Sequence, residues 1–205
     1  KNKLDKNAEN VSNLKIYKSE LVVGDKWSEP EQFPFNSNDY SCGHPTLSSD
    51  EKTMYFISDM PGGFGGTDIY KTVFDGTKWS QPENLGERIN TSGNEMFPYV
   101  HSDGTLYFSS DAHHTLGGLD VFMTTQIGNN WARPENLNYP LNSTGDDFSY
   151  VQSDDISGFV TSSRVDGKDK LFSFTKNEPV FMLFGIAHKK GSDETVEGVI
   201  IEITE

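Results

Sequence analysis

Three aspartates recur along the chain and are the first residues to consider for chemistry. Asp68 and Asp120 lie 52 residues apart, each after a Gly-Gly-x phrase, and Asp169 follows near the corresponding place in the next segment. A metal site or an acid/base pair would require such carboxylates to converge on one point. Equivalent places in successive repeats lie around a ring instead, so we expect these aspartates to accept backbone N–H groups at strand starts.

The histidines and turn acids show no metal-ligand pattern. Zinc sites need three or four converging ligands, often at short paired spacings, whereas His113 and His114 are adjacent and would point apart on an extended chain. Asp50, Glu51 and Asp103 lie in turns that lack the alternating acids of a twelve-residue calcium loop. We therefore predict no metal ligand and no cofactor.

Motifs for nucleophilic or phosphate chemistry are also absent from the sequence. The glycine-rich stretch 62–66 lacks the Gly-Lys-Ser/Thr of a phosphate loop, and we expect its glycines to supply positive φ. No Gly-x-Ser-x-Gly elbow occurs. The single cysteine, Cys42, precedes a predicted strand in a Ser/Asn/Gly-rich segment and cannot form an intrachain disulfide. We predict that the chain has no catalytic residue and is not an enzyme.

A segment that recurs about every 52 residues must position all of these side chains. Trp27, Trp79 and Trp131 each open a phrase of the type Trp-x-x-Pro-Glu-Gln/Asn-Phe/Leu, and a Tyr-Phe-x-Ser-Asp phrase recurs at 55–59 and 107–111. Self-similarity at this period is typical of a β-propeller, in which each blade is a four-stranded meander. We expect the tryptophans to pack between blades, with sugar-stacking platforms as the alternative.

The repeat predicts an all-β fold with two complete blades, one partial blade before them and one after. The expected strands of the complete blades and the last blade span 45–48, 53–58, 68–74, 79–85, 97–101, 105–109, 120–125, 131–137, 146–151, 157–162 and 169–174. Closed propellers have about four to eight blades, so we expect the remaining blades to lie N-terminally. Completion of the ring by a second copy is the alternative.

Composition bounds the domains and the partners. We expect a flexible arm at 1–12, the propeller at 13–175 and the first strands of a different β-domain at 180–205. The net charge of −14 and the pI near 4.7 repel nucleic acid and anionic lipid headgroups. No run of 18 apolar residues is present, so we expect no transmembrane helix, and no signal peptide is visible.

Longer phrases carry a family resemblance over residues 13–174. They are Gly43 to Ser48, Met54 to Gly63, Ile89 to Pro98 and Leu116 to Phe122. This pattern resembles the TolB-like (WD-repeat-like) propeller of Bacteroidetes OmpA-family proteins, which include a component of the type IX secretion system. The last repeat departs from the pattern, because Lys168 to Phe172 replaces a Gly-rich Asp-Asp-Ile-Tyr phrase.

The resemblance implies a location and a set of neighbouring domains. It implies a periplasmic protein at the outer membrane, in which 180–205 begins a carboxypeptidase-regulatory-like β-sandwich. The family binds peptidoglycan through an OmpA-like domain whose residues match nothing in this sequence. The implied function is a non-catalytic scaffold for protein partners of the secretion or gliding apparatus.

The longest loops within blades are the expected partner-contact sites. They span 60–67 and 112–118, and the candidate contact residues are Met60, Phe64, His113, His114 and Leu116. Two alternatives remain, a glycan-binding propeller and a propeller glycosidase with acids at its centre. The expected innermost strands at 45–48, 98–101 and 149–152 contain no acid, although Glu95, Asp146 and Asp147 come just before them.

Overall fold

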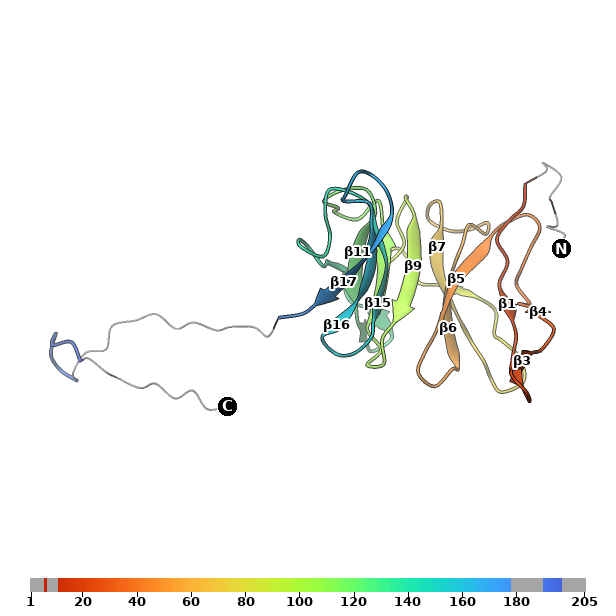
Figure 1. Cartoon of the computed structure of the whole chain (residues 1–205), viewed down its shortest axis with the longest axis horizontal. Coiled ribbons are helices and arrows are strands. Elements are labelled where there is room, and N and C mark those ends of the chain that lie inside the picture. The colour runs from red at the N-terminus through yellow and green to blue at the C-terminus, as the bar shows by residue number, and fades with distance from the viewer. Residues whose placement is uncertain (1–5, 7–10, 178–189, 197–205) are drawn as a thin grey trace. The chain divides into compact units, whose positions relative to one another are not determined.

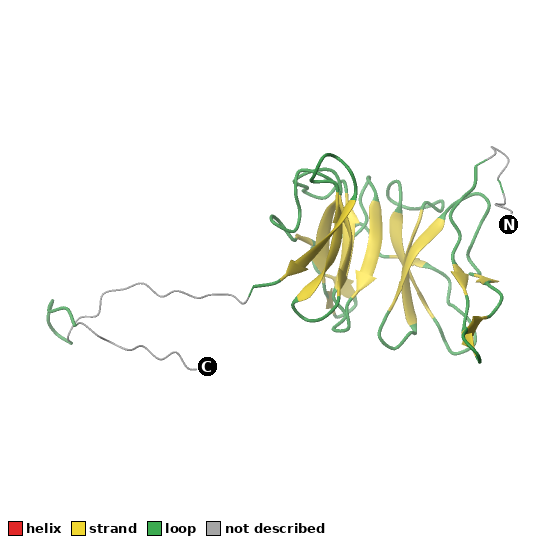
Figure 2. Cartoon of the chain, in the orientation of Figure 1, coloured by secondary structure: helices red, strands yellow, loops and turns green. Residues whose placement is uncertain are grey.

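The chain is described by a computed structural model that covers residues 6, 11–177 and 190–196. These residues form strands, turns and loops without a helix (Figure 2). Within them, therefore, no helix has the length and apolarity to cross a membrane. The chain divides into two compact units, Lys1–Thr175 and Lys176–Glu205. Most of the arm expected at 1–12 and of the β-domain expected at 180–205 lies outside the described residues.

Two four-stranded antiparallel sheets form the middle of the first unit, and each is a meander (Figure 1). The first sheet contains β5 (Cys42–Leu47), β6 (Thr53–Ser58), β7 (Asp68–Val73) and β8 (Glu83–Asn84). The second sheet contains β9 (Glu95–Val100), β10 (Leu106–Ser110), β11 (Asp120–Thr124) and β14 (Glu135–Asn136).

Incomplete versions of the same sheet flank these two. The third sheet contains β15 (Asp147–Gln152), β16 (Ser157–Ser162) and β17 (Lys170–Thr175). The N-terminal repeat pairs β1 (Tyr17–Lys18) with β4 (Glu31–Gln32), and β2 (Leu21–Val22) with β3 (Lys26–Trp27). The all-β expectation is confirmed, and strand order and register repeat from one sheet to the next.

The outer part of each repeat differs from the single long strand that the sequence predicts. Trp131 lies in a hairpin of β12 (Gln126–Ile127) and β13 (Asn130–Trp131), and Trp79 forms the equivalent bridge with Phe74. A proline follows three residues later in each repeat and cannot donate to a ladder. The chain therefore leaves the hairpin and pairs again only over the two residues of β8 or β14.

The hydrophobic core consists of three clusters that lie between neighbouring sheets. One joins the N-terminal repeat to the first sheet, the next joins the first sheet to the second, and the last joins the second sheet to the third. Side chains of adjacent residues on β6 enter different clusters, because strand side chains alternate between faces. Tyr55 and Ile57 face the second sheet, whereas Met54 and Phe56 face the N-terminal repeat.

The tryptophans occupy matching places, and their exposure depends on whether a preceding sheet is present. Trp79 packs edge-on against Phe33 of the preceding repeat, and Trp131 packs edge-on against Tyr55 with ring centroids 6.0 Å apart. Trp131 is 7 % exposed, whereas Trp27, which has no preceding sheet in the described residues, is 67 % exposed. Packing between neighbouring sheets is therefore confirmed for Trp79 and Trp131.

This difference predicts unequal costs for the same substitution. Trp131→Ala removes a buried aromatic from a joint between sheets and should lower the free energy of unfolding by about 3–5 kcal/mol. Trp27→Ala, measured at low protein concentration, should change it by at most about 0.5 kcal/mol. Urea unfolding followed by circular dichroism measures both, and equal effects would contradict the packing assignment.

Candidate functional site

The recurring aspartates anchor the long loops at one end of the sheets. Asp68 is buried, and its Oδ2 accepts hydrogen bonds from the Phe64 backbone N–H at 2.6 Å and from Asn84 Nδ2 at 2.7 Å. Asp120 Oδ2 accepts the same two bonds, from the Leu116 N–H at 2.6 Å and from Asn136 Nδ2 at 2.8 Å. The loop-capping role expected from the sequence is therefore confirmed for these two aspartates.

The third repeat does not follow this arrangement. Strand register pairs Lys170 with Ser162, as it pairs Asp68 with Ser58 and Asp120 with Ser110. The place expected for Asp169 is thus taken by Lys170, and Asp169 itself is exposed. The loop before β17 is shorter than the loops before β7 and β11, and the exposed Lys170–Asp166 ion pair at 3.1 Å lies at its end.

In three repeats, an asparagine that follows the outer strand hydrogen-bonds both backbone groups of one residue in, or next to, the third strand. Asn90 Oδ1 accepts the Ile69 N–H at 2.8 Å, and its Nδ2 donates to the Ile69 carbonyl at 3.0 Å. Asn142 binds both backbone groups of Val121 in the same way, and Asn36 does so with Ile16. Each asparagine bonds a residue that is twenty or twenty-one positions away in the sequence.

Two acids lie within the first strands of the second and third sheets, which corrects the expectation that these strands contain no acid. Glu95 begins β9 and Asp147 begins β15, and both are fully buried. Glu95 accepts hydrogen bonds from Thr91 and Ser110, and burial raises its pKa. Asp147 accepts from Ser143 and forms an ion pair with Arg164 at 2.8 Å. Both carboxylates are engaged by local donors rather than turned toward a substrate space.

In the first sheet a cysteine occupies the place that an acid occupies in the second and third sheets. Strand register places Cys42 opposite Ser58, as it places Glu95 opposite Ser110. The Cys42 thiol is fully buried, and burial raises its pKa, so the reactive thiolate is disfavoured. The site is therefore a packing position that accommodates either an acid or a thiol.

The glycine pairs allow the long loops to approach the next sheet closely. A Cβ on Gly65 or Gly66 would overlap the carbonyl of Thr91 or the side chain of Asn94, and Gly117 and Gly118 are crowded in the same way. The Gly66 N–H donates to the Gly93 carbonyl at 2.7 Å across this joint. In the stretch 62–66 only Gly62 has positive φ, so the expected role for the other glycines was wrong.

The five candidate contact residues divide into two groups. Phe64 and Leu116 occupy matching places, 48 % and 49 % exposed, and His114 is exposed beside them. Met60 packs against the cluster shared with the N-terminal repeat. His113 Nε2 donates a hydrogen bond to the Ile89 carbonyl at 2.9 Å, and its ring packs against Phe108 and Phe122. Of the five candidate contact residues, Phe64, His114 and Leu116 are therefore the exposed ones.

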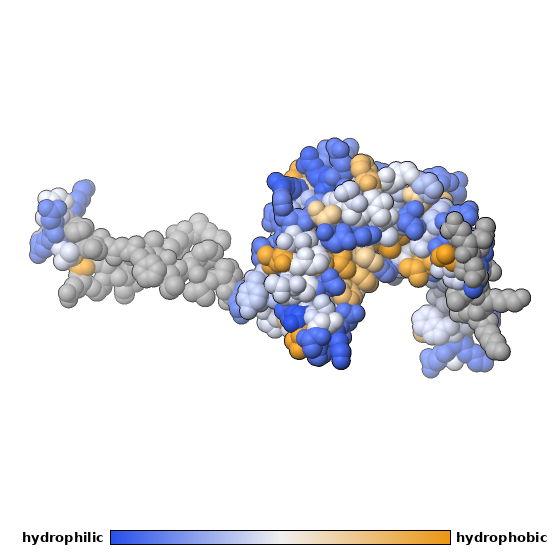
Figure 3. Space-filling view, turned by 90° about the horizontal axis from the view of Figure 1, so that it is seen from above, coloured by the Kyte–Doolittle hydropathy of each residue, from blue (hydrophilic) through white to orange (hydrophobic). Residues whose placement is uncertain are grey.

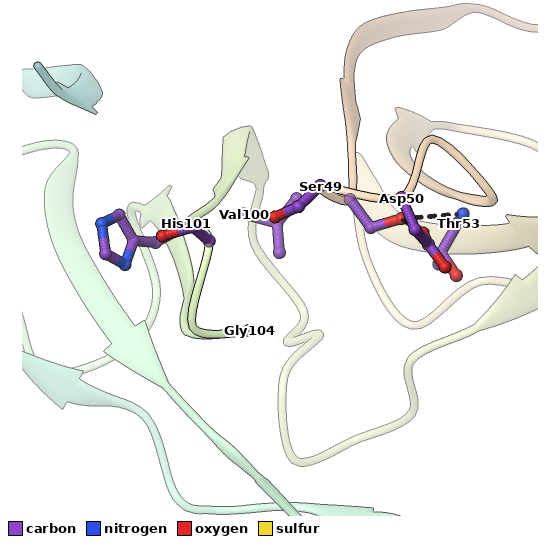
Figure 4. A pocket seen from close by; sticks show the side chains of 8 residues that line it. Ser49, Asp50, Thr53, Val100, His101 and Gly104 are labelled. Atoms are coloured by element: carbon purple, nitrogen blue, oxygen red, sulfur yellow. Dashed lines mark hydrogen bonds between the residues drawn. The ribbon is translucent and has the colours of Figure 1, made fainter.

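A shallow, open hollow of about 320 Å³ lies at the opposite ends of the same sheets. It lies between two hairpin turns, residues 48–53 and 100–104, and Figure 4 shows the His101 ring turned away from Ser49 and Asp50. Asp50 accepts hydrogen bonds from Ser48 and the Lys52 N–H, which lower its pKa. No group of three metal-ligating side chains occurs anywhere in the described residues.

Stacked rings connect the first strands of the three sheets. His44 stacks on Phe97 with centroids 4.1 Å apart, and Phe97 stacks on Phe148 at 4.9 Å. His44 Nδ1 accepts a hydrogen bond from the Phe97 N–H at 3.2 Å, which requires that nitrogen to be unprotonated. Burial lowers the pKa of His44, in agreement with a neutral ring.

Comparisons with known proteins add no family to this geometry. No protein-family model matches the chain, and a search of curated proteins finds no match.

The hydrogen bonds between Asn90 and the Ile69 backbone predict that removing the Asn90 amide destabilises the fold. Asn90→Ala would leave the buried N–H of Ile69 unpaired and remove one of the two hydrogen bonds to the Ile69 carbonyl. It should lower the free energy of unfolding by about 1–3 kcal/mol. Asn129→Ala, in an exposed hairpin turn, is the matched control and should leave it nearly unchanged. Chemical unfolding measures both variants, and similar curves would show that Asn90 does not hold the strand.

The stacked histidine predicts a pH dependence with a definite sign. The folded pKa of His44 is lower than the unfolded pKa of about 6.5, so the unfolded chain binds the proton more readily. The contribution of neutral His44 is complete above about pH 6.5 and is lost as pH falls through the folded pKa.

His44→Asn isolates this contribution, because asparagine tolerates the positive φ at this position and does not titrate. Thermal unfolding of both proteins between neutral and mildly acidic pH should show a steeper acid loss in the unsubstituted chain. If the unfolding midpoints of the two proteins fell equally with pH, His44 would not be the cause of the acid loss. Glu95, whose raised pKa acts in the opposite direction, is present in both proteins.

Proposed function

We propose that the successive sheets are blades of a β-propeller and that the chain is a non-catalytic scaffold that binds protein partners through its long loops. The propeller assignment is supported by meander sheets that repeat in register and pack face to face in sequence order. It is also supported by innermost strands that contact one another through the His44, Phe97 and Phe148 rings.

The observation that carries the scaffold proposal is the matching display of Phe64 and Leu116. Each is held at its backbone N–H by a buried aspartate, and its loop is pressed against the next sheet by a glycine pair. A loop fixed in this way loses little conformational entropy on binding. Val165, 46 % exposed, lies in the corresponding turn of the third sheet and extends the row of apolar tips.

The charge of the chain favours one kind of protein partner. With a net charge of −14, the scaffold attracts a partner that has basic groups around an apolar contact. By family resemblance, we place this scaffold in the periplasm at the outer membrane, in the type IX secretion or gliding apparatus. In the same proposal, a β-sandwich follows the propeller, and a separate OmpA-like domain provides the attachment to peptidoglycan.

Replacing both apolar tips tests this proposal. The double variant Phe64→Ser/Leu116→Ser should lose a cross-linked protein partner from an envelope extract and keep the same thermal unfolding midpoint. Ile127→Ser is the matched control, because Ile127 is more exposed than either tip but lies on the β12 hairpin. The control should retain the partner at the unsubstituted level.

Two outcomes would contradict the scaffold. Retention of the partner by the double variant would show that the loops are not the contact. Retention of muropeptides by the purified chain, without any protein partner, would favour the glycan-binding alternative, and release of a reducing sugar from them would favour the glycosidase.

A further inference from the structure

Each of the three sheets carries one exposed carboxylate at the end where the loops between second and third strands lie. It belongs to a pair of residues, one directly before the first strand and one directly after the second. A side-chain oxygen of the later residue accepts the backbone N–H of the earlier one. The pairs are Ser41 with Asp59 at 2.6 Å, Asn94 with Asp111 at 2.7 Å and Asp146 with Ser163 at 2.8 Å. The acid thus changes place within the pair, and all three acids are exposed.

The hydrogen bonds of these pairs do not require a carboxylate. In the third sheet the Ser163 hydroxyl accepts the N–H of Asp146, as an aspartate does in the first two sheets. Asn94 Oδ1 accepts the Thr67 N–H of the preceding sheet at 3.3 Å. Asp146 Oδ1 accepts the Leu119 N–H at 2.9 Å in the same place. Neutral side chains therefore fill both places, and these bonds do not explain why each pair keeps one negative charge.

The carboxylates alternate with the apolar loop tips along this end of the sheets. The glycine pair after Phe64 packs against the turn 91–93, whose other side packs against Asp111. The glycine pair after Leu116 packs directly against Asp146. The order is therefore apolar tip, carboxylate, apolar tip, carboxylate. Figure 3, seen from above, shows hydrophobic side chains of the first unit as separate spots among hydrophilic ones.

Among the described residues, neither Asp111 nor Asp146 forms an ion pair. Both oxygens of Asp111 accept neutral donors of Asn94, its backbone N–H and its Nδ2. The cation next to the third pair, Arg164, is already paired with the buried Asp147 at 2.8 Å. A cationic group of a partner would therefore meet carboxylates that no basic side chain of the described residues compensates.

We propose that the partner bound by the loop tips is an extended protein segment in which cationic side chains lie between apolar ones. Its apolar groups contact Phe64 and Leu116, and its ammonium or guanidinium groups contact Asp111 and Asp146. This inference rests on the proposed function and adds the chemistry of the partner to it. Sheets packed face to face lie about 10 Å apart, and four extended residues span about 13 Å. One cationic and one apolar residue on the same face of such a segment therefore match one carboxylate and one tip per sheet.

A set of synthetic peptides tests this chemistry on the purified chain. A fluorescein-labelled peptide that repeats Lys-Ser-Leu-Ser places lysine and leucine alternately on one face of an extended chain. Fluorescence anisotropy at low ionic strength should show that this peptide binds and that a Glu-Ser-Leu-Ser peptide does not. A Lys-Ser-Ser-Ser peptide, which lacks the apolar groups, should bind more weakly. Added salt should weaken the binding of the Lys-Ser-Leu-Ser peptide, because the carboxylates are exposed.

Matched substitutions show whether the charge acts locally. Asp111→Asn/Asp146→Asn should weaken the binding of the Lys-Ser-Leu-Ser peptide about two- to thirtyfold, the combined effect of two exposed ion pairs, and should keep the thermal unfolding midpoint. Asp75→Asn/Asp154→Asn removes the same charge from exposed hairpin turns at the opposite ends of the sheets. This control should bind the peptide as the unsubstituted chain does, because net charge alone is not the cause.

A swap within the third sheet provides a rescue test. Asp146→Asn alone should weaken the binding of the Lys-Ser-Leu-Ser peptide. The addition of Ser163→Asp should restore it, because the third sheet then contains the pair that Asn94 and Asp111 form in the second sheet. A role of Asp146 in the fold alone would not be rescued by a carboxylate on the neighbouring residue of the pair.

The outcomes separate this inference from the proposed function. The inference is overturned if the Lys-Ser-Leu-Ser peptide does not bind, if the Glu-Ser-Leu-Ser peptide binds equally, if the two double Asp→Asn variants lose equal affinity, or if the swap fails to restore binding. The proposed function is decided separately, by whether the Phe64→Ser/Leu116→Ser variant loses its cross-linked protein partner. Loss of that partner together with a failed peptide test would leave the loop tips as the contact and remove the cationic segment.

Discussion

Burial of each sheet on both faces is the constraint on which the structure depends. All five residues of β10 are buried, and their side chains enter the clusters on the two sides of the second sheet. A sheet with two apolar faces is not stable alone in water, and a single neighbour would cover only one of those faces. Stability therefore comes from the joints, and the side chains that recur every 52 residues are those that form them.

The outer strand is short, and this explains why a polar side chain is buried at each joint. Proline separates the hairpin from the two-residue strand β8, so β7 has few ladder partners on that side. The Leu85 N–H bonds the Ile69 carbonyl, and Asn90 supplies the missing partner for the Ile69 N–H. A buried amide with all its partners costs little, whereas an unpaired backbone group would cost about 1–3 kcal/mol.

The sequence could predict what local pattern and periodicity determine. The period of 52 residues located the sheets, the matching tryptophans and the capping role of Asp68, because each depends on residues close in sequence or repeated at one spacing. The prediction for Asp169 failed because the loop before β17 is shorter, and Lys170, one residue after Asp169, lies opposite Ser162. One residue of shift is not visible in a motif comparison.

Other features could not be predicted because their partners are distant in sequence. The glycine pairs read as turn glycines, and only the approach of the next sheet shows that a Cβ at Gly65 would overlap the Thr91 carbonyl. Glu95 and Asp147 read as acids just before the innermost strands. Strand β9 begins two residues earlier than the expected 97–101, and serine and threonine hydroxyls satisfy both buried carboxylates.

The same repetition is the physical argument behind our proposal of binding rather than catalysis. Catalysis needs different groups that converge, whereas a repeat places similar groups at regular intervals along one edge. The tips Phe64, Leu116 and Val165 keep an apolar character and differ in size, and two of them are fixed by buried carboxylates. A partner that contacts several tips gains from each, since the loops are already ordered. Binding free energy would therefore be spread over the loops, and single-tip substitutions would weaken the contact without abolishing it.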